Sequence, residues 1–311
     1  MSASFFLPGK DCTRGYANFR GMRKWKEMRG YVNRLWALYQ PFADAHFRED
    51  ARKHFLERYW EMYLTVACMA NGAKPIRARA AGPEFCFLHR GQTHWIEAIA
   101  PNAGTGKDQV RESDPADNFR IPVEKILLRY TSALREKQRK LDHDRARRVV
   151  NEADPYIVAI NSRGIPYAYA GNTLPYLLQA LFPIGPLVLS FDLQSKKVTG
   201  RSYQRREVLT KQCGSQVKTT AFLDLAYSGI SAVIHSAVDA ANLPRRLGAD
   251  FFVVHNPSAR NPIPISLFAQ WRQYVFEADR LSVIPPSRRT SQRHMSPDLR
   301  AVLLAPAAPV W

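Results

Sequence analysis

Two short apolar runs joined by a tight turn, residues 84–89 (EFCFLH) and 93–100 (THWIEAIA), constrain the fold of this chain more than any other feature. Each run has the length of a β-strand, and the Arg90-Gly91 pair between them is typical of a hairpin turn. The second run contains one charged residue, Glu97, between Ile96 and Ala98. A lone carboxylate inside a buried strand is unfavourable unless it is paired or holds a cation. The pattern therefore predicts an antiparallel pair of strands and a chemical reason for Glu97.

The segments around this hairpin predict an alternation of helices and strands. Apolar residues recur at helical spacing over residues 47–70, and again over residues 123–149. Residues 75–79 (PIRAR) predict a strand before the hairpin, and residues 156–161 (YIVAIN) predict a buried strand after the second helix. The predicted order is helix, three strands in a meander, helix, strand, and the predicted fold class is α/β.

Beyond residue 170 the sequence predicts more α/β structure, either as an extension of the same sheet or as a second small layer. We expect helices at residues 174–182 and 265–278, and strands at 186–193, 229–236 and 250–257. From residue 281 onward Pro, Ser and Arg dominate, which predicts a mobile basic tail. The predicted organisation is a basic aromatic N-terminal segment at 1–45, a core at 46–170, an extension of the same domain at 171–280 and the tail at 281–311.

The charge of the chain indicates a polyanionic partner. Its 45 Lys and Arg residues exceed its 27 Asp and Glu residues, which gives a net charge of +18 and favours nucleic acid over an anionic membrane surface. No apolar stretch approaches the length of a membrane span, and the start MSASFFLPGKDC lacks the regions of a signal peptide. The four cysteines form no CxxC pair, so we expect reduced thiols and a cytoplasmic protein.

Several common catalytic motifs are excluded. Residues 103–108 (AGTGKD) lack both the first Gly and the final Ser or Thr of a P-loop. Residues 228–237 contain no GxSxG elbow, and the Cys and His residues are too scattered for a zinc site.

The two carboxylates of the hairpin carry a resemblance to a known superfamily. Gly82-Pro83-Glu84 leads into the first strand, and Trp95-Ile96-Glu97 lies in the second. Together with the element order, these residues resemble the PD-(D/E)XK nuclease, or restriction-endonuclease-like, superfamily over residues 47–162. The resemblance implies a restriction-endonuclease-like core with a C-terminal α/β extension. It also implies catalytic acids at Glu84 and Glu97, and a third acid, Glu61, from the first helix.

The resemblance implies a metal ion as well. Glu61, Glu84 and Glu97 would bind Mg²⁺ (or Mn²⁺), because hard divalent cations prefer oxygen ligands. The bound ion would activate water for attack on a phosphodiester. Two of these residues also have a structural alternative: Glu61 as a surface charge paired with Arg58, and Glu84 as a hydrogen-bond acceptor at a turn.

The superfamily's lysine, two residues after the strand acid, is replaced here by Ile99. Some members supply this basic group from the following helix, where Lys125 and Arg129 stand one turn apart. Lys125 is therefore the candidate catalytic cation, and its alternative is an ordinary surface ion pair. Arg129 is a candidate nucleic-acid contact.

Other basic residues are further candidates for nucleic-acid binding. Arg260 lies in the turn-rich segment 253–264, which is otherwise interpreted as a structural corner. Lys24 and Lys26 belong to residues 14–34, where basic and aromatic residues alternate. That segment suits either phosphates with stacked bases or a packed amphipathic helix. The charge run at 135–148 is typical of a solvated helix face or of a nucleic-acid contact.

The sequence thus favours a metal-dependent nuclease that acts on nucleic acid, with DNA expected more than RNA. The alternative is a nucleic-acid-binding protein that keeps the fold and has lost catalysis, which the absence of the strand lysine at Ile99 would permit. A third hypothesis is a protein whose positive charge binds an acidic protein partner.

Overall fold

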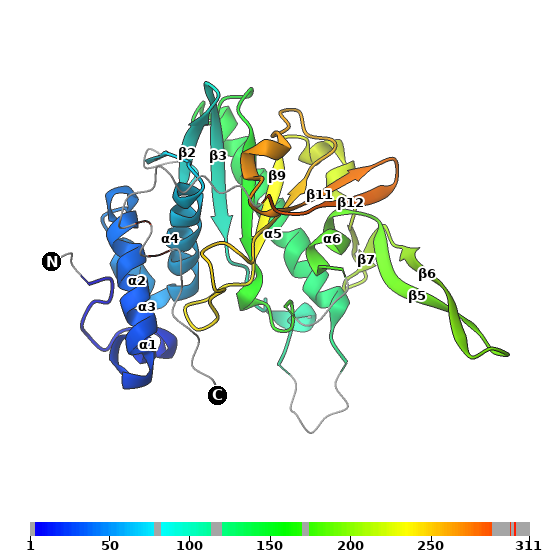
Figure 1. The fold of residues 1–311 in the computed structure, drawn as a ribbon, viewed down its shortest axis with the longest axis horizontal. Helices are drawn as coiled ribbons and strands as arrows, with labels where there is room; N and C mark the ends of the chain where they lie inside the picture. Colours follow the sequence, from blue (N-terminus) through cyan, green and yellow to red (C-terminus); the bar gives the residue numbers. More distant parts are fainter. Residues whose placement is uncertain are drawn as a thin grey trace.

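A large mixed β-sheet with helices on both faces forms the centre of the protein (Figure 1). The structure is a computed structural model that describes residues 4–77, 82–112, 120–169 and 174–287, together with Leu299 and Val302. The sheet has eight strands in the order β1-β2-β3-β4-β9-β10-β11-β12. The α/β class expected from the sequence is confirmed.

The elements have the following bounds. The helices are α1 (Arg14–Gly21), α2 (Lys26–Tyr39), α3 (Phe47–Lys53), α4 (Phe55–Ala70), α5 (Val123–Ala146) and α6 (Tyr176–Leu181). The strands of the large sheet are β1 (Pro75–Arg77), β2 (Phe85–His89), β3 (Gln92–Ile99), β4 (Tyr156–Asn161), β9 (Ala232–Ser236), β10 (Phe252–His255), β11 (Arg272–Glu277) and β12 (Arg280–Ile284). Two separate ribbons are formed by β5 (Ile184–Asp192) with β6 (Lys197–Arg205) and by β7 (Val208–Thr210) with β8 (Gln216–Lys218).

The first half of the chain follows the expected order. β1, β2 and β3 form an antiparallel meander, and β4 then pairs in parallel with β3, so that Glu97 lies beside Val158. The turn between β2 and β3 is made by Arg90 and Gly91, whose φ angles of 51° and 79° are both positive. Helices α1–α4 lie on one side of the sheet, and α5 and α6 on the other (Figure 1).

The helix expected over residues 47–70 is two helices. His54, with φ −121° and ψ 54°, leaves the helical region between α3 and α4 and breaks the hydrogen-bonded series. The apolar spacing continues across the break, which is why the pattern alone did not show it.

The expectation of a helix at residues 265–278 is wrong. A short 3₁₀ turn, Ile265–Phe268, is followed by β11, which pairs in parallel with β10 and antiparallel with β12. Tyr274 and Phe276 are buried, 5% and 7% exposed, in the alternation that a strand requires. Pairing with β10 therefore decides the conformation of this segment.

The expected tail also begins too early. Residues Arg280–Ile284 form β12 at the edge of the large sheet, and Val302 is fully buried, with its carbonyl oxygen accepting a hydrogen bond from the Tyr31 hydroxyl at 3.2 Å. Most of the segment 288–311 lies outside the described residues.

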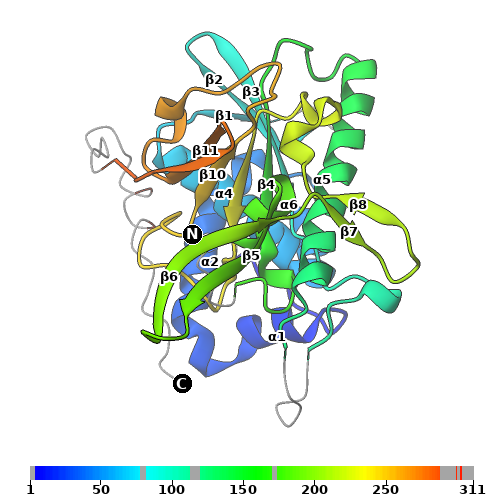
Figure 2. The same cartoon turned by 90° about the vertical axis from the view of Figure 1, so that its right-hand side faces the viewer.

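The second half of the chain extends the same sheet. β9 pairs in parallel with β4, and β10, β11 and β12 follow outward. The β5–β6 ribbon is separate and projects from the body at the end opposite α1–α3 (Figures 1 and 2). The sequence predicted β5 but not its partner β6.

The aromatic residues of the N-terminal segment are part of the core. Tyr16, Phe19, Tyr31 and Trp36 are each less than a tenth exposed. This favours the packed amphipathic helix over stacked bases for these side chains.

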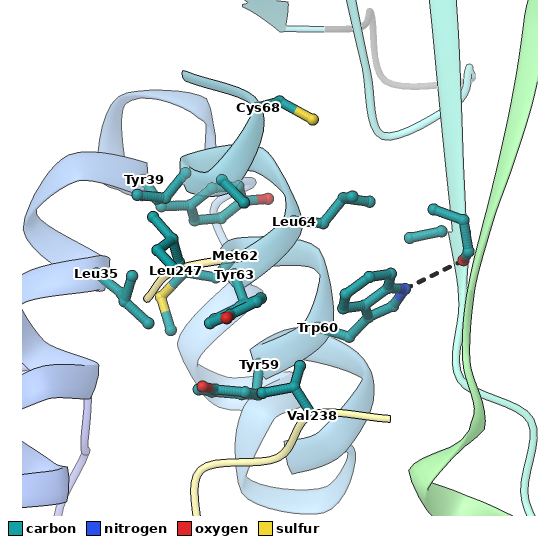
Figure 3. Close-up of a cluster of buried hydrophobic side chains, with 14 of the residues drawn as sticks. Leu35, Tyr39, Tyr59, Trp60, Met62, Tyr63, Leu64, Cys68, Val238 and Leu247 are labelled. Atoms are coloured by element: carbon teal, nitrogen blue, oxygen red, sulfur yellow. Dashed lines mark hydrogen bonds between the residues drawn. The ribbon is translucent and has the colours of Figure 1, made fainter. Parts of the chain in front are cut away.

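Helix α4 is buried on nearly every side, because it lies between α2 and the sheet (Figure 3). Trp60 is fully buried, and its indole N–H donates to the carbonyl oxygen of Ala159 in β4 at 3.1 Å. This bond fixes α4 against the strand next to β3, and so fixes the position of the acidic residue Glu61 on the same helix.

Two tyrosines of α4 allow a matched test of this packing. The Tyr63 hydroxyl accepts a hydrogen bond from the Gly248 N–H at 2.9 Å, whereas the buried Tyr59 hydroxyl has no hydrogen-bond partner among the described residues. Tyr63→Phe leaves a buried N–H without a partner and is expected to lower the free energy of unfolding by about 1–3 kcal/mol. Tyr59→Phe is expected to be neutral or stabilising. Urea unfolding of both variants measures the difference, and equal losses would contradict this hydrogen-bond assignment.

Candidate active site

The two carboxylates of the hairpin meet where β2 begins and β3 continues beyond it. Main-chain pairing of the two strands ends at Phe85 and Ile96, so Glu84 and Glu97 are the first residues past the paired region. A cleft of about 260 Å³ opens at this place, between α4 and α5. Its lining consists of His54, Glu57, Arg58, Trp60, Glu61, Glu84, Ala98, Ile99, Ala100 and Lys137.

Glu97 is buried and paired with two lysines of α5. Its side chain is 1% exposed, and its two carboxylate oxygens accept from the Nζ atoms of Lys137 at 2.6 Å and Lys140 at 2.5 Å. The alternation of β3 turns Glu97 towards α5, as it does Trp95 and Ile99. Burial by itself would lower the pKa of Lys137, but the carboxylates of Glu97 and Glu84 raise it above its ordinary value. Lys137 therefore stays charged beside Glu97.

Glu84 lies next to Glu97 but has a different environment. Its Oε2 accepts the main-chain N–H of Ala98 at 2.6 Å, in the region where β2 no longer pairs with β3. Its other oxygen makes no hydrogen bond within the described part of the chain. Burial, followed by the charge of Glu97, raises the pKa of Glu84 well above its ordinary value. The site therefore holds a carboxylate whose negative charge is poorly compensated.

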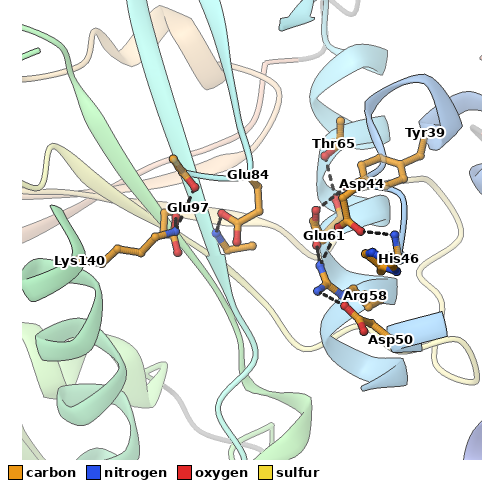
Figure 4. A network of polar contacts seen from close by, with 12 residues as sticks. Tyr39, Asp44, His46, Asp50, Arg58, Glu61, Thr65, Glu84, Glu97 and Lys140 are labelled. Atoms are coloured by element: carbon orange, nitrogen blue, oxygen red, sulfur yellow. Dashed lines mark hydrogen bonds and ion pairs between the residues drawn. The ribbon is translucent and has the colours of Figure 1, made fainter. Parts of the chain in front are cut away.

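Glu61 lies on the α4 side of the strands, whereas Glu97 faces α5 (Figure 4). Its oxygens accept from the Tyr39 hydroxyl at 2.5 Å and from Arg58 at 3.0 Å. Burial raises the pKa of Glu61, while the bonds from Tyr39 and Arg58 act in the opposite direction. The pairing with Arg58 that the sequence suggested as an alternative is present, although the carboxylate is more buried than a surface ion pair.

The three predicted metal ligands thus have different partners. Across the described ranges, no three His, Cys, Asp or Glu side chains lie close enough together to hold a metal ion. A magnesium site made by Glu61, Glu84 and Glu97 together stays a prediction.

The predicted catalytic cation, Lys125, lies elsewhere. Its Nζ donates to the carbonyl oxygen of Lys107 at 2.9 Å, and its side chain lines a different cavity of about 620 Å³. Lys125 is twelve residues before Lys137 on α5, which corresponds to roughly 18 Å along the helix axis. The cations that pair with Glu97 are Lys137 and Lys140, at the other end of the same helix, and a catalytic role for Lys125 stays a prediction.

The four predicted nucleic-acid contacts are spread over the molecule. Arg129 lines a hollow of about 220 Å³ that shares Ile99 and Ala100 with the cleft, and its Nε donates to the Asn102 carbonyl oxygen at 2.9 Å. Arg260 forms an ion pair with Glu152 at 2.7 Å. Lys24 and Lys26 are exposed at the start of α2 and in the turn before it. Of the four, only Arg129 adjoins the cleft, and nucleic-acid contact by any of them stays a prediction.

The sequence did contain a signal for the lysines that were missed. The apolar repeat of α5 continues from Leu134 to Leu141, and the position between them on the same helix face is Lys137. Asp144 follows one turn after Leu141 and is also buried, at 2% exposed. A charged residue that fills a gap in an apolar stripe faces the interior.

Comparison of the chain with protein-family profiles, curated proteins and solved structures finds no match. In the part of the chain that the structure describes, no helix has the length and apolar character needed to cross a bilayer.

The uncompensated charge of Glu84 predicts a pH-dependent stability. Because its folded-state pKa is raised above the ordinary 4.5, its contribution to stability is fully present below that value and is lost as the pH rises through the folded-state pKa. Glu84→Gln removes the buried charge and keeps an oxygen for the Ala98 N–H. We expect this variant to melt above the wild type at pH 8, by roughly 2 °C or more for each 1 kcal/mol gained, with a smaller gain at pH 5.

Glu61→Gln is the control for this prediction. It also removes a buried carboxylate charge, but this charge is in an ion pair with Arg58 at 3.0 Å, so the loss of the pair offsets the gain and no higher melting temperature at pH 8 is expected. Thermal melts at the two pH values compare the variants. A Glu84→Gln variant less stable than the wild type at pH 8 would show that the Glu84 charge is compensated in the folded protein.

Proposed function

We propose that this protein is a nuclease-like phosphodiesterase with its active site at Glu84, Glu97 and Lys137. The observation that carries the proposal is the meeting of two buried carboxylates and a helix-borne lysine at the place where β2 and β3 part. An acid–acid–lysine set at such a place is what the restriction-endonuclease-like resemblance implies. The positions of Glu84 and Glu97 are those expected from the sequence, and Lys137 takes the role first assigned to Lys125.

The topology around the site supports the same proposal. Helix α4, the β1–β3 meander, α5 and β4 follow one another, and β4 lies parallel to β3. This is the arrangement that the resemblance implies for a restriction-endonuclease-like core. The α/β extension of β9–β12 lies beyond β4, and none of the residues that line the cleft belongs to it.

The carboxylates fit a divalent cation as a two-residue ligand set. Mg²⁺ is commonly held by one or two carboxylates, with water and substrate phosphate oxygens completing its coordination. Glu84, with one oxygen not hydrogen-bonded within the described ranges and with a raised pKa, is suited to this role beside Glu97. When bound, Mg²⁺ or Mn²⁺ would lower the pKa of a water molecule and polarise the phosphate.

Lys137 would supply the cation that the strand lacks at Ile99. Its Nζ contacts Glu97 at 2.6 Å, and its side chain lines the cleft. An ammonium group in a partly buried cleft stabilises the negative charge that develops on a phosphate more effectively than one in water. Lys140, whose side chain is 36% exposed, holds the other oxygen of Glu97 and so orients the carboxylate.

The net charge of +18 supports a nucleic acid as the phosphodiester substrate, and DNA is the form we propose.

A nucleic-acid-binding protein without catalysis is the second candidate. Both oxygens of Glu97 are in ion pairs, and the described residues contain no group of three metal-binding side chains. If these ion pairs persist when the protein binds nucleic acid, Glu97 is a structural residue and the cleft binds phosphate without cleaving it.

Cleavage assays on Lys137 separate the two candidates. Purified protein is incubated with duplex DNA, single-stranded DNA and RNA in the presence of Mg²⁺ or Mn²⁺. If the wild type cleaves, Lys137→Met is expected to reduce the rate about a hundredfold, the scale for loss of one transition-state donor, with little change in binding. Lys125→Met, at the other end of α5, is the matched control and is expected to cleave at the wild-type rate.

Two further variants test whether a loss of cleavage reflects a folding defect instead of a loss of catalysis. Lys137→Arg keeps a cation beside Glu97, and is expected to fold like the wild type while cleaving more slowly. Glu97→Gln is expected to abolish cleavage. Binding without cleavage by the wild type, with every metal and substrate tested, would support the second candidate instead, and normal cleavage by Lys137→Met would remove this lysine from the mechanism.

A further inference from the structure

The most exposed apolar surface of the molecule lies on the β5–β6 ribbon. Among the described residues, seven of the sixteen exposed large hydrophobic side chains belong to it: Leu187, Val188, Leu189, Phe191, Leu193, Val198 and Tyr203. A two-stranded ribbon that stands away from the core has little stability of its own in water. Such a concentration of apolar residues marks a surface that contacts another molecule.

The register of the ribbon gathers five of these residues on one face, whereas Val188, which pairs with Ser202, lies on the other. Leu187 pairs with Tyr203, Leu189 with Arg201 and Phe191 with Val198, and directly paired residues share a face. Leu193, at the turn, is 85% exposed. The ribbon therefore presents an apolar face that contains one arginine and ends in an apolar tip.

The turn at the end of the ribbon is closed by hydrogen bonds, and two lysines follow Leu193 there. The Asp192 carboxylate accepts from the Gln194 N–H at 2.9 Å and from the Ser195 hydroxyl at 2.6 Å, which closes the turn. Lys196 and Lys197 follow directly, are exposed and form no ion pair within the described part of the chain. Asp192 is the single carboxylate of the ribbon, against four cations that include Arg201 and Arg205.

We infer that the β5–β6 ribbon is an arm that enters a groove of a nucleic-acid duplex. This inference rests on the nucleic-acid function proposed above for its choice of partner. Nine residues of extended chain span about 30 Å, more than the width of a groove, and a two-stranded ribbon fits the major groove. Arms that bind duplexes combine cations for the phosphates with apolar side chains that wedge between base steps. Lys196 and Lys197 beside Leu193 offer this combination.

Charge complementarity favours a duplex over a second copy of the chain. Another copy would bring the same cations, within a net charge of +18, against the ribbon. A polyanion brings the opposite charge to all of them.

Duplex binding measured in EDTA tests the arm independently of cleavage. We expect Lys196→Gln/Lys197→Gln to weaken binding of a labelled duplex about tenfold and to reduce the slope of log K against log salt by about two. The control is Lys10→Gln/Lys53→Gln, which removes the same charge beside α3, at the end of the molecule opposite the ribbon (Figure 1), and is expected to retain the wild-type slope. Equal losses in both pairs, or none in the ribbon pair, overturn the assignment.

A substitution at Leu193, the residue at the tip, distinguishes a duplex partner from a second copy of the chain. Leu193→Ser, at an 85% exposed position, is expected to fold normally, to weaken duplex binding and to leave sedimentation unchanged. If it converts a dimer into a monomer and binds duplex normally, the ribbon is a contact between copies and the inference is overturned.

Hydrolysis of a small phosphodiester in the presence of Mn²⁺ tests the proposed function separately from this inference. Such a substrate is too small to contact the ribbon while it is bound in the cleft. If Lys196→Gln/Lys197→Gln weakens duplex binding while the wild type hydrolyses no phosphodiester, the inference about the ribbon is supported and the catalytic proposal is contradicted. If the wild type hydrolyses the small substrate and Lys196→Gln/Lys197→Gln binds duplex normally, the inference about the ribbon is contradicted and the catalytic proposal is supported.

Discussion

The carboxylate of Glu97 is buried in the middle of the sheet and has to be paired inside the protein. Lys137 and Lys140 meet this requirement from α5, at 2.6 and 2.5 Å. Removing one partner of such a buried pair commonly costs about 3–5 kcal/mol, because the remaining charge is left uncompensated. The pairing therefore constrains the rotation of α5 about its axis, as well as the chemistry of the site. The apolar residues Leu134 and Leu141 on the same helix face keep the lysines pointing inward.

Next to Glu97, the buried side chain of Glu84 lowers the stability of the folded protein when it is charged. Its pKa is raised by burial and by the charge of Glu97, so the folded protein stabilises the charged form of Glu84 less well than water does in the unfolded chain. Residues held at the expense of stability are concentrated at functional sites. On the other side of the strands, Tyr39 and Arg58 compensate Glu61. Glu97 and Glu61 are thus each paired with cations of the protein, whereas Glu84 has no ion pair within the described ranges.

Much of the fold followed from local patterns, and the errors have identifiable physical causes. The β2–β3 hairpin was correctly expected because turn chemistry and alternation act within a few residues. The segment 265–278 was wrongly expected to be helical, because parallel pairing with β10 and burial of Tyr274 and Phe276 outweigh local propensity. The strand β12 was missed for a similar reason, since among the described residues it pairs with β11 alone. The sequence also led us to expect a cation from Lys125 beside Glu97, whereas Lys137 and Lys140 pair with that carboxylate.

The sequence by itself determined the α/β class, the meander and the location of two carboxylates, because alternation, helical spacing and charge inside an apolar run are visible over short stretches. Only the tertiary structure decided which cation meets Glu97, because the answer depends on how α5 lies across β3. Lys125 and Lys137 share one helix, but only Lys137 reaches the end of β3 where the paired strands separate. The position of Glu61 was decided in the same way, since α4 packs on the face of the sheet opposite α5, where Tyr39 and Arg58 bind its carboxylate.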